Sequence, residues 1–352
     1  MAFAKIAKFQ GSLIIKSMKK ICRGFLIFMV AAVFTACKEK EQVEYSFFPD
    51  ENKRLTVFSC IDKNLTGLLV QEFENITGIW VELFCGESEQ VRALLEDCES
   101  QEAAKNCDVL LCTLPDSFPL FEKFASSHIK NNSRVPRPFG KKNFAVFSVT
   151  PVGFLYNVDF FPEKDGSLMS QFKQIDEISL ANPYFSTENF LCLYALFKSQ
   201  QEFQIKKLSK VYGSFNSAAE AVAEGFSKLT VMPENQAMIF INSHYSFTTQ
   251  FFLPKNAAVI VNASTIMKFC RYKDNAERFI AFLQSTETQN FLHEQYKYRF
   301  VRTDMTLNSE EFGFVNKSLQ NPQTEDYGAE NFSYSKSEIL QTWLKKISGG
   351  TK

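Results

Sequence analysis

Residues 55–83 read LTVFSCIDKNLTGLLVQEFENITGIWVEL, and they contain a strand, a helix and a second strand in close succession. Residues 55–60 form a short apolar run, which indicates a buried strand. Between residues 64 and 77 the apolar side chains recur at helical spacing, and Gly78 is a typical residue for ending a helix. Residues 79–84 form a second apolar run. This order predicts a β-α-β unit.

The residues that follow extend this unit in the same alternating order. Ser88 is a suitable N-cap for a helix through residues 91–95, and residues 108–112 form a third short apolar strand. A βαβαβ order is typical of an α/β fold with parallel strands. Further along, the same reasoning predicts an extended stretch at 144–156 broken at Pro151 and Gly153, strands at 178–183, 230–232 and 237–241, and helices at 187–196, 217–226, 275–283, 286–296 and 337–347.

The N-terminal sequence is typical of an export signal. A basic region begins at Met18, an apolar run covers residues 24–34, and small residues precede Cys37. The apolar run is shorter than the roughly 20 residues that a transmembrane helix needs. A cysteine at this point resembles the lipobox of bacterial lipoproteins, whose cysteine is acylated, although Phe34 stands where leucine is usual. The alternative is an ordinary signal peptide with a chance cysteine.

We therefore divide the N-terminal region into three parts. Residues 1–17 are an extension or follow from a mis-assigned start, and residues 18–36 are a lipoprotein signal peptide. Residues 37–53 are a lipid anchor and a polar tether. We expect an exported protein that is held at a membrane by the lipid on Cys37 and faces the periplasm or the cell exterior.

Composition and motifs exclude several functions. The 39 lysines and arginines equal the 39 acidic residues, so no strong field favours nucleic acid. The sequence has no GxSxG or HExxH motif and three scattered histidines, so we do not expect an enzyme. Apart from Cys22 and Cys37, an odd number of cysteines remains, and these cannot all pair. Cys98 and Cys107 could close a small loop by a disulfide, or they could be buried free thiols.

Five segments in this order resemble the extracytoplasmic solute-binding proteins of ABC importers, in the branch that includes ferric-iron, phosphonate, thiamine and polyamine binders. These segments are residues 55–83, 108–112, 150–157 (TPVGFLYN), 178–183 (ISLANP) and 275–289 (NAERFIAFLQSTETQ). The resemblance implies a two-lobed α/β fold, the type II fold of periplasmic binding proteins, with a central ligand cleft. It places lobe one at 54–147 and 256–320, lobe two at 148–255, and a C-terminal tail at 321–352.

The cleft residues are expected beyond the carboxyl ends of the strands, where loops expose backbone N–H groups and helix N-termini. For each serine and threonine in this set, simple helix capping is the alternative. The candidate ligand-binding residues are Ser59, Cys60, Glu87, Ser88, Thr113, Asp116, Thr150, Asn182, Ser186, Thr187 and Tyr245.

The sequence leaves the ligand open. Ferric binders of the resembled family use two adjacent tyrosines late in lobe two, whereas this chain has Tyr245 preceded by His244. These two residues could bind a metal ion such as iron, or Tyr245 could line the cleft and stack on an organic solute. Glu87, Glu89 and Asp116, on the expected cleft loops, would suit a cationic ligand. A metal ion, an oxyanion and an organic cation therefore all remain as ligands, and no other cofactor is expected.

The function that the resemblance implies is capture of a small solute and its delivery to an ABC-type permease by a monomeric lipoprotein. Closure of the lobes about residues 150–153 and 252–257 would trap the solute. The alternative is a binding-protein fold kept as a surface or sensor lipoprotein without transport, which the missing tyrosine pair and the acidic Glu87 would suit.

Overall fold

The computed structural model describes residues 52–100, 106–114, 118–135, 142–161, 168–172, 175, 177–198, 208–245, 247–254, 257–307 and 336–348. All of them belong to one compact unit, Pro49–Lys352. The signal peptide, Cys37, the tether up to residue 51 and Asp116 lie outside the described residues. None of the described helices is long and apolar enough to cross a membrane.

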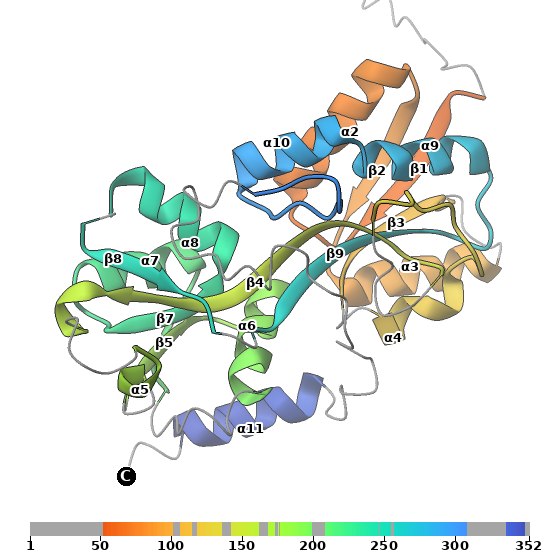
Figure 1. The fold of residues 1–352 in the computed structure, drawn as a ribbon. Coiled ribbons are helices and arrows are strands. Elements are labelled where there is room, and N and C mark those ends of the chain that lie inside the picture. Colours follow the sequence, from red (N-terminus) through yellow and green to blue (C-terminus); the bar gives the residue numbers. More distant parts are fainter. Residues whose placement is uncertain are drawn as a thin grey trace, which may run out of the picture. The chain divides into compact units, whose positions relative to one another are not determined.

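The described strands form one mixed sheet in the order β2-β1-β3-β9-β4-β7-β5-β6, and β8 pairs with β4 (Figure 1). We use lobe one for β1, β2, β3, β9 and the first half of β4, and lobe two for the remaining strands. As predicted, β1 is parallel to β2 and β3. The strands are β1 (Arg54–Ser59), β2 (Trp80–Cys85), β3 (Val109–Leu114), β4 (Ala145–Asn157), β5 (Ile178–Ala181), β6 (Leu208–Tyr212), β7 (Leu229–Pro233), β8 (Thr249–Phe252) and β9 (Val259–Ile266).

Helices cover both lobes, and most of the predicted helices are present near their expected bounds. Residues 237–241 were predicted to form a strand, and this prediction is wrong, because they belong to α8 and to the π-helix that follows it. The helices are α2 (Lys63–Thr77), α3 (Ser88–Ser100), α4 (Phe118–Phe121), α5 (Leu168–Phe172), α6 (Thr187–Lys198), α7 (Phe215–Ala223), α8 (Glu234–Phe240), α9 (Lys273–Leu283), α10 (Thr286–Tyr296) and α11 (Lys336–Ser348), with the π-helix at Ile241–Tyr245.

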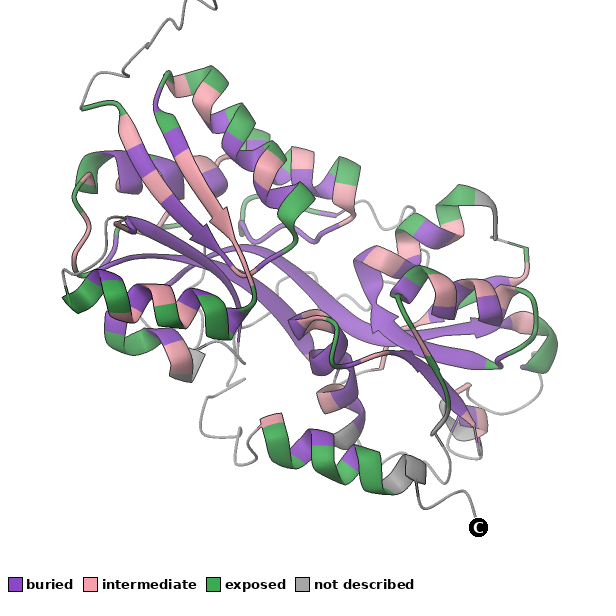
Figure 2. Cartoon of the chain, turned by 180° about the vertical axis from the view of Figure 1, so that it is seen from behind, coloured by how far each residue is buried: buried purple, intermediate pink, exposed green. Residues whose placement is uncertain are grey.

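Strand β4 joins the two lobes and is continuous, whereas the sequence predicted breaks at Pro151 and Gly153. Its first half pairs with β9 as far as Pro151, and its second half pairs with β7 from Val152 onward. Pro151 lacks an N–H group, but at this change of partners that loss is tolerated more easily than in mid-ladder. The two strands that cross between the lobes, β4 and β9, are buried along their whole lengths (Figure 2).

Gly153 is required by the close approach of β8. A Cβ atom at this position would lie 2.5 Å from a ring carbon of Phe251 and 2.6 Å from the carbonyl oxygen of Phe252. Real side chains do not tolerate such distances, so the neighbouring strand would have to move. The glycine that looked like a strand breaker therefore lets two strands of lobe two meet beside the crossing point.

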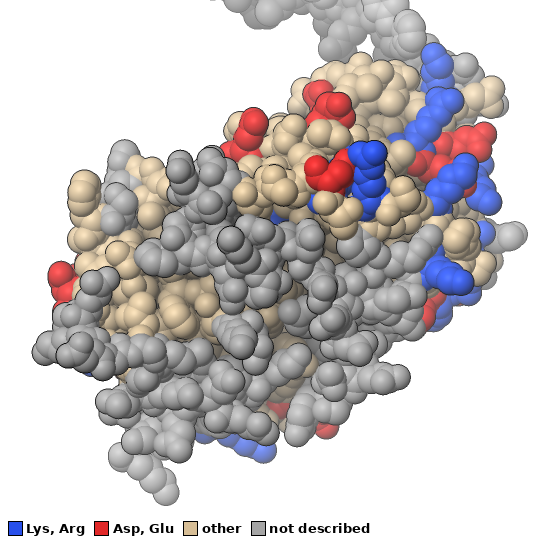
Figure 3. Space-filling model, in the orientation of Figure 1, with Lys and Arg blue, Asp and Glu red and all other residues tan. Residues whose placement is uncertain are grey.

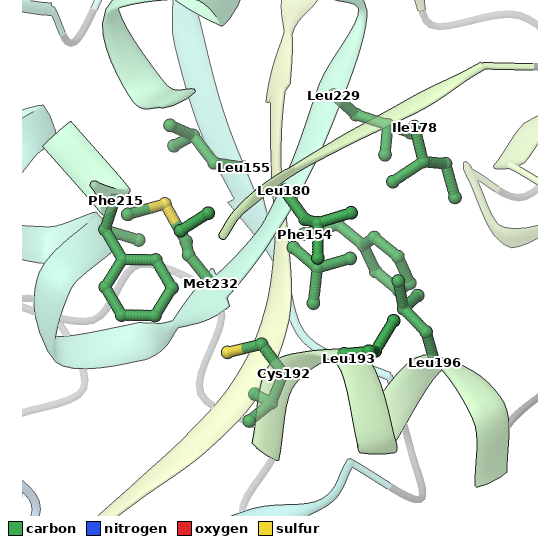
Figure 4. Packing of buried hydrophobic residues seen from close by; sticks show 14 of the residues in the cluster. Phe154, Leu155, Ile178, Leu180, Cys192, Leu193, Leu196, Phe215, Leu229 and Met232 are labelled. Carbon is green, nitrogen blue, oxygen red and sulfur yellow. The ribbon is translucent and has the colours of Figure 1, made fainter. Parts of the chain in front are cut away.

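Each lobe has its own hydrophobic core. In lobe one, α2, α9 and α10 pack on one face of the sheet, where the Phe73 and Phe279 rings meet edge to face at 4.9 Å. Another cluster, which includes Val91 of α3 and Phe121 of α4, covers the opposite face. In lobe two, side chains of α6 such as Leu193 pack against the strands (Figure 4).

Helix α11 is part of the lobe-two core, although the sequence around it is polar. Its Ile339, Leu340 and Trp343 side chains are buried in that core. The Trp343 ring also contacts Tyr184, with 5.8 Å between the ring centroids. Because Tyr184 belongs to the turn that precedes α6, α11 supports the loop that leads into this helix.

Charged side chains are mixed on the surface. On the face that Figure 3 shows, acidic and basic side chains are interspersed over the lobe-one end of the unit. This agrees with the balanced composition, in which 39 basic residues face 39 acidic ones. No single-sign patch therefore dominates this face among the residues drawn in colour.

Candidate functional site

A cleft of about 640 Å³ lies between the two lobes and is open to solvent. Its walls come from the loops that follow the strands and from the first turns of α2, α3, α6 and α7. Lobe one contributes Cys60, Ile61, Asp62, Lys63, Cys85, Gly86, Glu87, Gln90 and Thr113, and lobe two contributes Phe185, Ser186, Thr187, Glu188, Asn189, Gly213, Ser214, Phe215, Asn216 and Gln236.

On the lobe-one wall, polar side chains first satisfy the protein's own backbone. The Asp62 carboxylate accepts a hydrogen bond from the Leu65 N–H group at 2.8 Å and so caps α2. The Thr113 hydroxyl donates to the Asn262 side chain of β9 at 2.8 Å. Glu87, next to α3, is exposed in the cleft, and its N–H group donates to the Gln90 side chain at 3.3 Å.

Two cysteines on this wall, Cys60 and Cys85, have low reactivity. Burial raises the pKa of Cys60 to about 12, and burial also raises the pKa of Cys85. Both side chains are therefore neutral thiols near pH 7, which are poor nucleophiles and poor metal ligands. All seven cysteines in the described part of the chain, including Cys98 and Cys107, are free thiols.

On the lobe-two wall, the turns before α6 and α7 have the same capping arrangement. The Ser186 hydroxyl accepts a hydrogen bond from the Asn189 N–H group at 3.1 Å. Ser214 accepts one from the Ser217 N–H group at 3.1 Å and completes a capping box. Glu188, the second residue of α6, differs from these groups because burial and the nearby Asp62 raise its pKa to about 7.

A buried polar network lies where the lobes join. Thr150 of β4 donates to the Asn235 side chain at 3.0 Å and accepts from the Asn235 N–H group at 3.2 Å. Beside it, Arg299 forms a two-bond ion pair with Glu234, at 2.6 and 2.7 Å. Both charged side chains are almost fully buried, and the Arg299 N–H group also donates to the Val149 carbonyl at 3.1 Å. This network ties α8 to β4 and to the segment after α10.

The structure brings five of the predicted site residues together in the cleft, and it places others elsewhere. Cys60, Glu87, Thr113, Ser186 and Thr187 line the cleft. The other described residues are not in the cleft lining. Ser59 bonds Thr66, Thr150 bonds Asn235, and the Asn182 side chain accepts from the Tyr184 N–H group, while Ser88 starts α3 and its side chain interacts with Cys60. Asp116 and the side chains of His244 and Tyr245 lie outside the described part of the structure.

Sequence reasoning missed several cleft residues. Asp62 and Lys63 begin α2, and an N-cap aspartate before an apolar periodic run is a readable signal for a helix start. Glu188 looked like an ordinary acidic residue in a first turn. The turn at residues 213–216 was missed because the helix after it was predicted to begin only at Ser217, and Gln236 was missed because part of α8 was predicted as a strand.

A metal centre is not evident in the described residues. They contain no group of three or more His, Cys, Asp and Glu side chains that could hold a metal ion. The cleft instead offers hydroxyl, amide and carboxylate groups together with Phe185, whose side chain is 60% exposed. Such a mixture of polar groups and aromatic surface is typical of sites for small organic molecules.

No family model matches the sequence, and no curated protein sequence matches it. Several solved structures have a fold similar to that of this chain. Iron-bound HitA from Pseudomonas aeruginosa has 17% sequence identity and a TM-score of 0.65, over 83% of this chain and 99% of its own. The ferric binding protein from Campylobacter jejuni has 15% identity and a TM-score of 0.61, over 84% and 98%.

The periplasmic binding protein AfuA from Actinobacillus pleuropneumoniae, with exogenous fructose-6-phosphate bound, has 15% identity and a TM-score of 0.59, over 84% of this chain and 98% of its own. These identities are too low to transfer a ligand, but the matches extend over nearly the whole of the other chains. With the sheet order and the strands that cross between the halves, they show that this chain has the two-lobed α/β fold of type II periplasmic binding proteins.

Proposed function

We propose that the chain is an exported solute-binding protein, which captures a small solute between its lobes and delivers it to an ABC-type permease. The observation that carries the proposal is the open cleft of about 640 Å³, which both lobes line with polar side chains. Pockets for small molecules usually have about 300–1,000 Å³.

The structures with a similar fold bind different solutes. HitA is described with iron and AfuA with fructose-6-phosphate. The fold therefore supports solute capture in general, and the ligand has to be argued from the cleft of this chain.

The proposed mechanism is closure of the lobes about the strands that cross between them. The hinge residues are 150–153 of β4 and the connection between β8 and β9, close to the residues where β4 changes partners. Closure is driven only if the ligand binds the closed state more tightly than the open one. Small-angle scattering should show a smaller radius of gyration with ligand than without it.

We also propose that a lipid on Cys37 holds the protein at the membrane, as the order of the signal sequence supports. Growth with radiolabelled palmitate in a bacterium that processes lipoproteins should label the chain. A Cys37→Ser variant should not be labelled and should leave the membrane fraction. Label on the variant would contradict lipidation at this residue.

The main test of solute capture is a thermal-shift screen of the purified protein against sugars, amines, oxyanions and metal ions. A ligand at 100 times its Kd adds about 2.7 kcal/mol to the free energy of unfolding. If no solute in such a screen raises the melting temperature, solute capture fails. Delivery is tested separately, because cells without this chain should lose uptake of the identified ligand.

A further inference from the structure

The cleft carries more acidic than basic side chains. Its described lining contains three carboxylates, Asp62, Glu87 and Glu188, and one cation, Lys63. Each carboxylate belongs to the start of a helix that opens on the cleft: Asp62 caps α2, Glu87 precedes α3, and Glu188 is in the first turn of α6. At these positions the carboxylates offset the positive ends of the helix dipoles.

These helix ends are therefore poor sites for an anion. A helix N-terminus attracts anions through N–H groups that have no partner. Here Asp62, Ser186 and Ser214 already accept hydrogen bonds from the first turns of their own helices. An anionic ligand would find fewer free N–H groups there and would have to approach the carboxylates as well.

Glu188 is the group that most needs a ligand. Its side chain is partly buried and borders the cleft, and this burial raises its pKa. No hydrogen bond or ion pair to it is found among the described residues. The titratable groups around it are Asp62 of α2, Cys192 of its own helix and Tyr298 after α10, none of which is a cation. A buried carboxylate without a partner is costly.

Two further features point to an organic cation. Asp62 belongs to lobe one and Glu188 to lobe two, both line the cleft, and Asp62 lies near enough to raise the pKa of Glu188, so a cation bound between them would be attracted to both lobes. Phe185, three residues before Glu188, presents a largely exposed ring at the same cleft. Aromatic faces bind organic cations, with the cation within about 6 Å of the ring centroid.

We propose that the ligand is a small organic cation, bearing amine or guanidinium groups, which Glu188 and Asp62 hold from opposite lobes with Phe185 beside it. This inference rests on the proposed solute capture and names its ligand class. It makes Glu188 and Asp62 the residues that select for positive charge. A cation would also supply the partner that the partly buried Glu188 lacks among the described residues.

The experiment is a thermal-shift and calorimetric titration of the full-length protein in mild detergent at about pH 8. The cationic probes are 1,4-diaminobutane, agmatine and choline, and the other probes are phosphate, citrate and ferric nitrilotriacetate. At least one cation should raise the melting temperature. If only an anion or iron does so, the ligand class is wrong while solute capture stands, and if no probe binds, both fail.

Three variants connect the binding to these residues. Glu188→Gln and Asp62→Asn should each weaken binding of the cation at least tenfold, whereas Glu224→Gln, an exposed residue outside the cleft, should leave it unchanged. Asparagine still caps a helix, so α2 keeps its N-cap. Unchanged affinity in Glu188→Gln would overturn the proposal.

A variant that loses binding because it misfolds can be recognised from the melting temperature of its ligand-free form. Folding raises the pKa of Glu188 from 4.5 to about 7, so its contribution to stability is complete below pH 4.5 and is lost as the pH rises through 7. At about pH 8 the ligand-free Glu188→Gln protein should therefore melt no lower than the parent. A higher melting temperature together with lost cation binding supports the proposal.

Discussion

The buried ion pair between Glu234 and Arg299 gives the sharpest stability prediction. Its side chains are only 4% and 2% exposed, and the guanidinium donates two hydrogen bonds to the carboxylate, at 2.6 and 2.7 Å. Glu234→Gln would remove the carboxylate charge that pairs with the buried Arg299 guanidinium. Removing one partner of such a pair costs about 3–5 kcal/mol. This is a large part of the roughly 5–15 kcal/mol by which folded proteins are stable.

The assay is urea unfolding followed by circular dichroism, with Glu234→Gln, Arg299→Met and the double variant. Because the two residues depend on each other, the double variant should be less destabilised than the sum of the single variants, by about 2 kcal/mol. The control is the exposed pair of Lys130 and Glu277, whose N–O distance is 2.7 Å, and Lys130→Met should not change the midpoint measurably. A loss below about 1 kcal/mol for Glu234→Gln, or additive losses, would refute the reasoning.

Four other predictions follow from single residues. Gly153→Ala should destabilise the protein by about 1–3 kcal/mol in urea unfolding, because its Cβ would meet β8. Gly67→Ala, in mid-helix with nothing within 4 Å, should stabilise it by about 1 kcal/mol. Binding of an organic cation should tighten about tenfold from pH 6 to pH 8 in calorimetry, because Glu188 titrates near 7. Trp343→Ala should cost about 3–5 kcal/mol by thermal unfolding, since this buried ring joins α11 to lobe two.

Much of the fold is predictable because its signals are local. The spacing of the apolar residues and Gly78 together define α2. In the structure Gly78 ends this helix with a φ of 65°, a left-handed conformation that glycine adopts readily. Residues 237–241 were predicted as a strand because a run of five apolar residues fits a buried strand and a buried helix equally well. Pro151 was predicted to break the strand because proline cannot donate a backbone hydrogen bond. Whether a strand can contain a proline depends on which strands pair with it at that point, and the local sequence does not show this.

The site was predictable only in part, for a related reason. Cys60, Glu87 and Thr113 follow the carboxyl ends of predicted strands, so topology alone directs attention to them. The turn at 213–216 was missed because α7 begins two residues before the predicted Ser217, and its Ser214 cap was not recognised. Glu188 is acidic in a first turn, which is ordinary for a helix. Only the structure shows that it borders the cleft and that burial and Asp62 raise its pKa.

The pair of Asp62 and Glu188 also suggests how a ligand could control closure. The two carboxylates belong to opposite lobes and are close enough for Asp62 to raise the pKa of Glu188. Bringing the lobes together without a ligand increases their repulsion, whereas a cation between them turns that repulsion into attraction on both sides. The charges would then disfavour an empty closed state and favour a filled one, which is the difference in affinity that closure requires.

Asp62→Asn separates this control of closure from binding alone. The substitution keeps the cap of α2 but removes one of the two charges, so the ligand-free variant should populate the closed state more than the parent does. Small-angle scattering at about pH 8, where Glu188 is mostly ionised, should give a smaller radius of gyration for the ligand-free variant. At about pH 5, protonation of Glu188 should bring the parent closer to the variant. Equal radii at both pH values would show that the hinge, and not the charge pair, sets the open state.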